Sequence, residues 1–550
     1  MVDAHTSRLC VQIIRSHFGP LTAEVASTLL TRGRLSFAQL LRYSDAGVRS
    51  KQRSVRAAVL VLVQHNVLWH AQSEEEGEVF EVNVEECLMR LRFGRFLYLT
   101  EELFGKAAME IVQLIMDHGK LRPPDILEKL HLAGSHDVKT IAVYQQALHR
   151  LVSGCYLKPS TMLSHISPRD KQIQYEAEEK AKVTGIPTAK ELRQMKEAAL
   201  ARLKREEEEA EKVGLKRKVK DPPGHRSSKK AKTVEEVEEV DDNVHFRLNY
   251  EKYNIHIRNA LIVKAAGERF NSGAARVLEA TLKVTESNQK KLTDTKTGPI
   301  SIANILMQFT DEDDLSSGLV YSSSKKTSLP NCVKDYLGLL SSADNPSPAG
   351  KAAAFTSFLN SKVQVEFEVI GSRLRQRVLE AMTLEKHGTA GVRIVRLLLE
   401  MGKMDEKQVA KTVMMAPKDI RPLLTALATD AFISMQEVPK SADRNPTRTF
   451  YLWYVDLQKA YSVLLCNLYK TLYNIGARRQ SESEGAEIKA VLEKRERIDV
   501  IQDESLLSRL ERELLKDWQE KQERLVVLEM RVEESVFVLR DMGVFGINDD

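Results

Sequence analysis

Three segments of the chain repeat one pattern, in which leucines or isoleucines precede a glycine and a leucine or methionine follows two residues later. The segments are LLTRGRLSFAQLL, LIMDHGKLRPPDIL and LLLEMGKMDEKQVA, with central glycines Gly33, Gly119 and Gly402. Glycine at the end of a helix permits the backbone conformation that a tight turn between packed helices requires. One match would carry little weight, but three in register predict a repeated domain.

A second shared signature lies further along the chain from each glycine, where a helix pattern passes directly into a strand pattern. The segments are LVLVQHNVLW, LHRLVSGCYL and LTALATDAFI, in which Asn66, Gly154 and Asp430 are expected to end the helix in a left-handed conformation. In the first and last copies a second β-rich run follows, over 78–82 and 448–455. Three helices followed by a hairpin is the order of a winged-helix domain.

A further, less regular copy is predicted between Tyr250 and Ile370. Here KYNIHIRNALIVKAAGERF is expected to form a first helix, ISIANILMQF a second, and FTSFLNSKVQVEFEVIG the closing helix and strand. The serine-rich segments DLSSGLVYSSSKKTSLP and SSADNPSPAG interrupt the pattern and are interpreted as loop insertions.

A charged region separates the second copy from this further copy. AKELRQMKEAALARLKREEEEAEKV has almost only charged and small residues and is predicted to be an exposed helix. LKRKVKDPPGHRSSKKAK, with its prolines and glycine, is predicted to be a flexible basic linker, and acidic VEEVEEVDD follows it.

The C-terminal region has two amphipathic patterns on either side of QSESEG. The first runs from Leu457 to Ile475, and the second predicts one long helix from Ala486 to Arg540. The apolar stripe of the second pattern consists of Leu507, Leu510, Leu514, Trp518, Leu525, Leu528, Val532, Val536 and Leu539. An antiparallel helical hairpin is predicted.

The predicted fold is therefore mainly α-helical with small β-hairpins: four tandem winged-helix domains followed by a C-terminal antiparallel coiled coil. The predicted boundaries are 1–85 for winged helix 1, 86–165 for winged helix 2, 166–245 for the charged helix and linker, 246–371 for winged helix 3 with its loop insertions, 372–456 for winged helix 4, and 457–550 for the coiled coil.

Several classes of function are disfavoured. The five cysteines lie far apart without a C-x-x-C pair, so neither a zinc site nor a disulfide framework is expected. The phosphate-binding, nucleophile-elbow and metalloprotease motifs are missing from the sequence, so the chain is not expected to be an enzyme by itself and no cofactor or metal is predicted. The longest apolar run, over 57–63, is too short to span a membrane.

Nucleic-acid affinity would have to come from local patches, because 82 Lys and Arg residues are nearly matched by 77 Asp and Glu residues. Basic residues gather at the start of the third helix in the first domain, at the corresponding place in the fourth, and in the fourth domain's wing, where a winged helix contacts phosphates. These candidates are Arg49, Lys51, Arg53, Arg56, Lys418, Arg421, Arg444 and Arg448. They could also form salt bridges in a protein interface.

Tyr451, Trp453 and Tyr454 follow these basic residues in a strand pattern. They are interpreted as core residues rather than as a platform for stacking bases, although single-stranded DNA would suit such a face. His65, on the third helix of the first domain, is expected to be partly exposed and neither a ligand nor a base.

Two basic clusters in the linker have the layout of a bipartite nuclear localisation signal. They consist of Lys216, Arg217, Lys218, Lys229, Lys230 and Lys232. The predicted compartment is the nucleus, and the alternatives are a solvated linker or a loose phosphate-binding arm.

Several phrases carry a resemblance to a known family. They are SHFGP from Ser16, LVQHNVL from Leu62 and LMRLRFGRFLYLTEELFG from Leu88, and the order of domains agrees to the C-terminus. Together they resemble the large winged-helix subunit of eukaryotic RNA polymerase III, a family related to the α subunit of the general factor that helps polymerase II open promoters. The family phrase has tyrosines where this sequence has Phe93 and Phe96.

The resemblance implies a non-catalytic accessory subunit in the initiation subcomplex of RNA polymerase III. Its implied partners are the clamp of the polymerase core, a smaller winged-helix subunit and an acidic-tailed subunit in a heterotrimer, and promoter DNA, single- or double-stranded. Its implied role is promoter engagement, opening and initiation at small-RNA genes such as those for 5S rRNA and tRNA. Two alternatives stay open: a winged-helix protein-interaction scaffold without DNA contact, and a free-standing DNA-binding regulator that dimerises through its coil.

Overall fold

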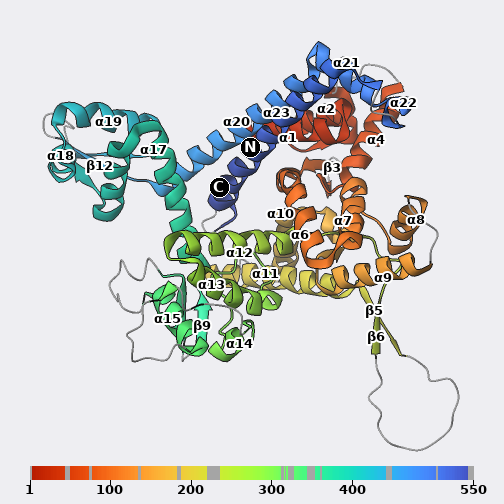
Figure 1. Ribbon diagram of the computed structural model, residues 1–550, viewed down its shortest axis with the longest axis horizontal. Helices are drawn as coiled ribbons and strands as arrows, with labels where there is room; N and C mark the ends of the chain where they lie inside the picture. The colour runs from red at the N-terminus through yellow and green to blue at the C-terminus, as the bar shows by residue number, and fades with distance from the viewer. Residues whose placement is uncertain are drawn as a thin grey trace, which may run out of the picture. The chain divides into compact units, whose positions relative to one another are not determined.

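The structure is a computed structural model of the chain. It describes residues 3–43, 50–73, 77–133, 138–182, 188–219, 236–310, 315, 318–319, 328–342, 354–359, 362–440, 449–502 and 506–542. The chain divides into two compact units, Met1–Tyr253 and Asn254–Asp550. Each consists of helices with small antiparallel sheets (Figure 1), which confirms the mainly α-helical class with β-hairpins.

Unit 1 begins with a helical domain closed by a three-stranded sheet. Its elements are α1 (Ala4–Phe18), α2 (Pro20–Arg32), β1 (Leu35–Ser36), α3 (Phe37–Tyr43), α4 (Ser50–Gln64), β2 (Leu68–Ser73) and β3 (Gly77–Val82). The sheet has the order β1-β3-β2, and Leu35 of β1 pairs with Phe80 of β3. Gly33, which ends α2, has a φ of 86°, so the repeated glycine occupies a conformation that other residues rarely adopt.

The next part of unit 1 repeats this order of helices followed by a strand. Its elements are α5 (Val84–Met89), the short turn η1 (Arg90–Arg92), α6 (Phe93–Phe104), α7 (Lys106–His118), α8 (Pro123–Ala133), α9 (Val138–Ser153), β4 (Leu157–Pro159) and η2 (Met162–His165). The strand that pairs with β4 comes from far along the chain and is β7 (Phe246–Leu248). Leu121, two residues after Gly119, also bridges to Phe246. Residues 246–248, which the sequence assigns to the third domain, therefore pair within unit 1.

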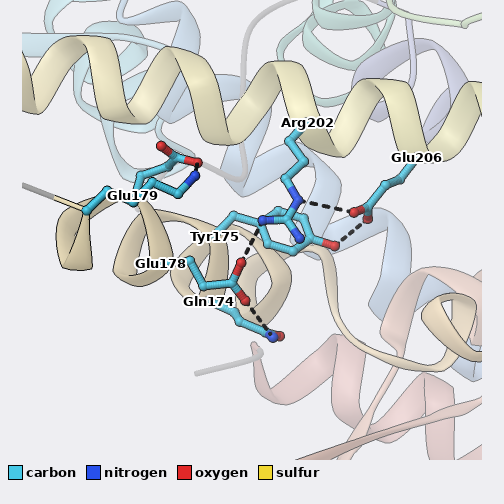
Figure 2. Close-up of polar contacts among 7 residues, drawn as sticks. Gln174, Tyr175, Glu178, Glu179, Arg202 and Glu206 are labelled. Carbon is cyan, nitrogen blue, oxygen red and sulfur yellow. Dashed lines mark hydrogen bonds and ion pairs between the residues drawn. The ribbon is translucent and has the colours of Figure 1, made fainter.

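Between β4 and β7 lie a pair of helices and a pair of strands: α10 (Pro168–Ala181), α11 (Ala189–Lys212), β5 (Leu215–Val219) and β6 (Glu236–Val240). Figure 2 shows how α10 and α11 are joined. The Arg202 guanidinium lies 4.3 Å from the ring centroid of Tyr175 and 2.6 Å from Glu178, and the Tyr175 hydroxyl donates to Glu206. Most described side chains of α11 are exposed, as predicted, but Met195 and Ala199 are buried, so the helix has one covered face.

The region predicted as a flexible basic linker begins in a strand. β5 and β6 pair antiparallel, with Lys216 opposite Glu239. A basic strand is therefore matched with an acidic one. The interpretation of 215–219 as flexible is wrong, because these residues find backbone partners in the acidic segment that follows.

The first part of unit 2 departs from the predicted pattern. Its first helix, α12 (Tyr250–Arg269), begins in the last residues of unit 1. The other elements are α13 (Ser272–Thr285), η3 (Glu286–Asn288), α14 (Ile302–Leu306), α15 (Leu329–Ser341), β8 (Thr356–Leu359) and β9 (Lys362–Val365). FTSFLNSKVQVEFEVIG, predicted to supply the closing helix and strand, forms β8, β9 and the start of the next helix, and helix α13 was not predicted. Ile300 bridges to Val363 of β9, as the residue two positions after the turn glycine bridges to a later strand in the other copies.

The second part of unit 2 repeats the three-stranded sheet of the first domain. It consists of α17 (Phe367–Met401), β10 (Met404–Asp405), α18 (Glu406–Val413), α19 (Pro417–Thr429), β11 (Ser434–Pro439) and β12 (Thr449–Tyr454). The order is β10-β12-β11, with Met404 opposite Trp453. A residue with a φ of 67°, Gly388, interrupts α17, and Gly402 ends it with a φ of 79°.

Unit 2 ends in α20 (Leu457–Glu484), α21 (Ala486–Arg495), α22 (Ile498–Gln502) and α23 (Arg509–Arg540). α20 and α23 run antiparallel, because Arg479 pairs with Glu529 while the later Glu482 pairs with the earlier Lys521. The prediction of one helix from Ala486 to Arg540 is wrong, since the described part of this range holds three separate helices. Their shared core is Val491, Val500, Leu507 and Leu515, whereas Leu510 and Leu528 of the predicted stripe are 69% and 45% exposed.

The predicted left-handed helix ends are correct at one position and displaced by one residue at two. Asn66 has a φ of 57° as predicted, but the left-handed residues of the other copies are Cys155 and Ala431 rather than Gly154 and Asp430. Within the described part of the chain, no helix combines the length and the apolar character that crossing a membrane requires.

Candidate nucleic-acid interface

Helix α4 presents a basic face because its opposite face is buried. Val55, Val59 and Leu62 are at most 4% exposed and follow helical spacing toward the core. Arg53 and Arg56 therefore lie on the solvent side, where both are exposed. Neither forms an ion pair with another described residue.

The other two predicted residues of this cluster are less well placed. Arg49 lies outside the described residues, and Lys51 is in α4 but its side chain is not among those described. The second half of the same exposed face is apolar, since Leu60 is 60% and Val61 40% exposed. This face of α4 thus combines positive charge near its start with exposed aliphatic carbon further along.

Helix α19 occupies the corresponding position in the C-terminal domain. It begins with Pro417 and continues through Pro422, so the two prolines leave a regular helix start. Lys418 and Arg421 are exposed as predicted. Arg421 is engaged with Glu406 of α18, with a guanidinium nitrogen 2.9 Å from the carboxylate. An exposed pair of this kind is worth at most about 1 kcal/mol, so a phosphate could displace the carboxylate.

The wing of this domain is only partly described. Arg444 and Arg448 lie outside the described residues. Tyr451, Trp453 and Tyr454 are all half-buried, so their interpretation as core residues is wrong. They belong to a wing strand that is covered less completely than a core strand.

Sequence reasoning missed Phe450 and the two lysines that lie over aromatic rings of β12. Phe450 is 48% exposed, and Lys440 Nζ lies 4.3 Å from its ring centroid. Lys403 Nζ lies 5.2 Å from the ring centroid of Tyr454. The available signal was the spacing of Phe450, Leu452 and Tyr454, which occupy every second position of the strand pattern and therefore share one face.

The C-terminal end of α4 is fixed against the loop after α7. Gln64 Nε2 donates to the backbone oxygens of His118, at 3.2 Å, and Lys120, at 2.7 Å. Lys120 Nζ donates in return to the Val63 oxygen at 3.1 Å. A Cβ on Gly119 would stand 2.5 Å from the Gln64 oxygen, so only glycine fits here. This junction orients α4 and its basic start relative to the following domain.

His65 belongs to this junction and not to the basic face. Its ring centroid is 4.6 Å from that of Phe18, and the residue is buried, so the prediction of partial exposure is wrong. Burial, together with the positive charges of Arg90, His118 and Lys120, lowers the pKa of His65 to about 3. Burial also lowers the pKa of Lys120 to about 8. His65 is therefore neutral at physiological pH.

The predicted localisation residues are divided between described and undescribed parts of the chain. Lys216 is exposed on β5 and pairs with Asp241 at 2.7 Å. Arg217 and Lys218 lie in β5, but their side chains are not among those described, and Lys229, Lys230 and Lys232 lie outside the described residues. Where the structure is described, no cluster of three or more His, Cys, Asp or Glu side chains could hold a metal ion.

Two family descriptions match the parts of the chain that carry these faces. Residues 8–72 match the RNA polymerase III subunit RPC82 helix-turn-helix domain. Residues 379–455 match the POLR3C C-terminal winged-helix domain. Winged-helix domains are therefore present in the chain, and the match over residues 379–455 carries that description itself.

Comparison with whole proteins extends the match to nearly the full length. The chain is 26% identical to DNA-directed RNA polymerase III subunit RPC3 of Rattus norvegicus over 563 residues, which cover 97% of each chain. The subunit of the same name from Homo sapiens is 26% identical over 564 residues, again covering 97% of each chain. The Aspergillus niger subunit rpc3 is 26% identical over 641 residues, covering 98% of this chain and all of that subunit.

The chain is a full-length homologue of RNA polymerase III subunit RPC3, also described as RPC82, and the resemblance drawn from the sequence is confirmed. The same matches confirm the prediction of winged-helix domains and the assignment of the chain to transcription. The relatives are named as polymerase subunits, which agrees with the prediction that this chain is not an enzyme by itself.

Proposed function

We propose that the chain is a non-catalytic accessory subunit of RNA polymerase III that binds DNA and partner subunits and supports promoter engagement, opening and initiation at small-RNA genes. The observation that carries this proposal is the homology to subunit RPC3 over 97% of both chains. The exposed basic starts of α4 and α19 support the DNA-binding part.

The proposed architecture is four winged-helix domains followed by a coiled coil, with residues 246–248 moved from the third domain to the second because they pair with β4. A recurrent contact supports the count of four. The residue two positions after a glycine bridges to a later strand in every copy: Leu35, Leu121, Ile300 and Met404. The antiparallel pairing of α20 with α23 supports the coiled coil.

The proposed partners are the clamp of the polymerase III core and two smaller subunits, one with winged helices and one with an acidic tail. Affinity purification of the tagged full chain from nuclear extract, at physiological salt, tests this assembly. Recovery of the polymerase III core with two small subunits is expected. Recovery of the chain alone or with unrelated proteins would contradict the proposed function.

Nuclear import is proposed to use the two basic clusters of the 215–232 region. Receptors for such signals bind extended peptide, so the pairing of β5 with β6 competes with use of the first cluster. Replacing Lys229, Lys230 and Lys232 by glutamine in the fluorescently tagged full chain is expected to shift it toward the cytoplasm. The same number of substitutions at exposed Lys190, Arg193 and Lys196 of α11 is the matched control. Unchanged nuclear accumulation would remove this signal from the proposal.

A second candidate function is a protein-interaction scaffold without DNA contact. The exposed Leu60 and Val61 on the basic face of α4 favour it, because exposed aliphatic side chains beside charge are typical of protein interfaces. Leu60→Ser with Val61→Ser would then reduce co-purification of the polymerase and leave DNA affinity unchanged. Leu510→Ser, which removes an exposed leucine elsewhere, is the matched control.

A further inference from the structure

One face of the C-terminal wing presents two aromatic rings, each with a lysine beside it. Phe450 and Tyr454 are four residues apart on β12, so their side chains leave the same face of the strand. The ammonium groups of Lys440 and Lys403 lie 4.3 Å and 5.2 Å from the two ring centroids. These are cation-π contacts, and they also place positive charge next to flat apolar surfaces.

The exposure of this face is unusual for a strand that holds a sheet together. Phe450 is 48% exposed, and Val438, directly opposite it on β11, is 37% exposed. β12 is nevertheless the central strand, paired on both sides, which keeps its side chains in fixed positions. Tyr454 is half-buried and lies opposite the buried Ser434, so the inner ring is the more firmly held. Rigid, partly exposed rings are suited to stacking against other flat groups.

The carboxylates described near this face do not cancel the positive charge of the two lysines. Glu437 pairs with Tyr451, so its side chain belongs to the other face of the sheet. Asp405 lies opposite Leu452 on the same face, but its carboxylate caps α18 by accepting from the Glu406 backbone nitrogen at 2.9 Å. Among the described residues of this face, an anionic ligand would therefore meet two lysines and one carboxylate that is already engaged.

We propose that this face of β12 binds single-stranded nucleic acid, with one base stacked on Phe450, another on Tyr454, and Lys440 and Lys403 moved from the rings to the phosphates. Four residues of a strand span about 14 Å, so the two rings take separate bases. Aromatic platforms with flanking positive charge bind single strands with little dependence on sequence. The inference deepens the proposed function and rests on its DNA-binding part.

A duplex fits this face less well than a single strand does. In a duplex both faces of each base are covered by its neighbours, so a ring on a strand surface has no base face to stack against. The lysines would contact phosphates of either form. Stacking on Phe450 therefore predicts a selective loss for single strands when the ring is removed.

The test is binding of labelled oligothymidine, and of a duplex of mixed sequence, to the purified full chain. Phe450→Ala is expected to weaken oligothymidine binding about tenfold and duplex binding by less than about twofold. Phe450→Trp keeps a stacking surface and should retain the affinity. Phe358→Ala, which removes a phenylalanine that is 45% exposed on β8, is the matched control and should change neither. Thermal unfolding of each variant checks the fold.

The lysines give a second measurement that does not depend on Phe450. Lys403→Gln with Lys440→Gln should reduce the slope of log affinity against log salt by about 0.7 for each lost phosphate contact with the single strand. An unchanged slope would remove the lysines from the site.

Four results would overturn the inference. One is unchanged oligothymidine affinity in a folded Phe450→Ala chain, and another is an equal loss for single strand and duplex. A third is loss of polymerase co-purification with unchanged oligothymidine affinity, which would make the face a protein contact. If the wild-type chain co-purifies with the polymerase but does not bind oligothymidine, the inference is overturned and the proposed assembly is not. If the chain binds oligothymidine through Phe450 but does not co-purify with the polymerase, the proposed function is contradicted and the inference is not.

Discussion

The first and the last winged-helix domains share a sheet of the same strand order, yet their exposed third helices differ. On α4, Arg53 and Arg56 have no ion-pair partner among the described residues, and Leu60 is exposed on the same face. On α19, Arg421 is held by Glu406 of the preceding helix. The repeated core therefore conserves the architecture, while each copy carries a different surface, which suits a chain that meets several partners.

The turn glycines also share a sequence pattern but differ in their surroundings. Gly119 and Gly402 both have positive φ, but a Cβ on Gly119 would meet the Gln64 backbone at 2.5 Å, whereas nothing lies within 4 Å of one on Gly402. The same sequence pattern thus has two physical causes. At Gly402 the backbone conformation alone requires glycine, and at Gly119 the close approach of α4 adds a second requirement.

The largest expected effect tests this difference. Gly119→Ala should lower the free energy of unfolding by about 4 kcal/mol, because strain and a backbone clash act together. Gly402→Ala should cost about 2 kcal/mol from strain alone. Denaturant unfolding of the two variants measures both values. Equal losses would show that the close packing at Gly119 contributes nothing.

Acid should affect unit 1 first. Burial lowers the pKa values of His17 and His165 to about 4 and that of His65 to about 3, below the ordinary value of 6.5. Between pH 6.5 and about 4 the unfolded chain takes up protons that the folded unit does not, so stability falls as pH falls through this window. Hydrogen exchange across the chain is expected to report earlier opening of residues 1–253. His65→Phe should reduce the effect, and simultaneous opening of both units would contradict it.

Removal of charge from the two helix starts should separate their roles in DNA binding. Arg53→Gln with Arg56→Gln is expected to weaken duplex binding by the full chain about tenfold, with a salt slope reduced by about 0.9 for each lost contact. Lys418→Gln with Arg421→Gln should have a smaller effect, because Arg421 is already paired. Lys190→Gln with Arg193→Gln removes equal charge from α11 and serves as the control. An unchanged affinity in the α4 variant would favour the scaffold function.

The smallest expected effect concerns Glu406. Glu406→Gln releases Arg421 from its ion pair, and duplex affinity should rise about threefold because the pair is worth less than about 1 kcal/mol. Anisotropy titrations at low salt measure this. The double variant Glu406→Gln with Arg421→Gln should lose the gain, and persistence of the gain would show that Arg421 does not contact DNA.

The candidate interface could be predicted only in part. Helical periodicity correctly placed Arg53, Arg56, Lys418 and Arg421 on exposed helix starts, because the core side of an amphipathic helix determines its solvent side. The engagement of Arg421 with another helix could not be predicted, since it depends on how two helices cross. The exposed Phe450 was missed and its neighbours Tyr451, Trp453 and Tyr454 were interpreted as core, because an aromatic strand pattern does not reveal how far a wing extends beyond the body of the domain.

The sequence by itself determined the repeated order of helices, glycine turn and strand, and the family, because these depend on local spacing and on residue identity. The tertiary structure decided which distant segments complete each copy. β4 pairs with β7 across the charged region, and the predicted helix from Ala486 to Arg540 is divided so that Val500 and Leu507 reach a common core. The physical reason is that such contacts join residues far apart along the chain, and the free energy of burial that selects them is not a property of any single segment.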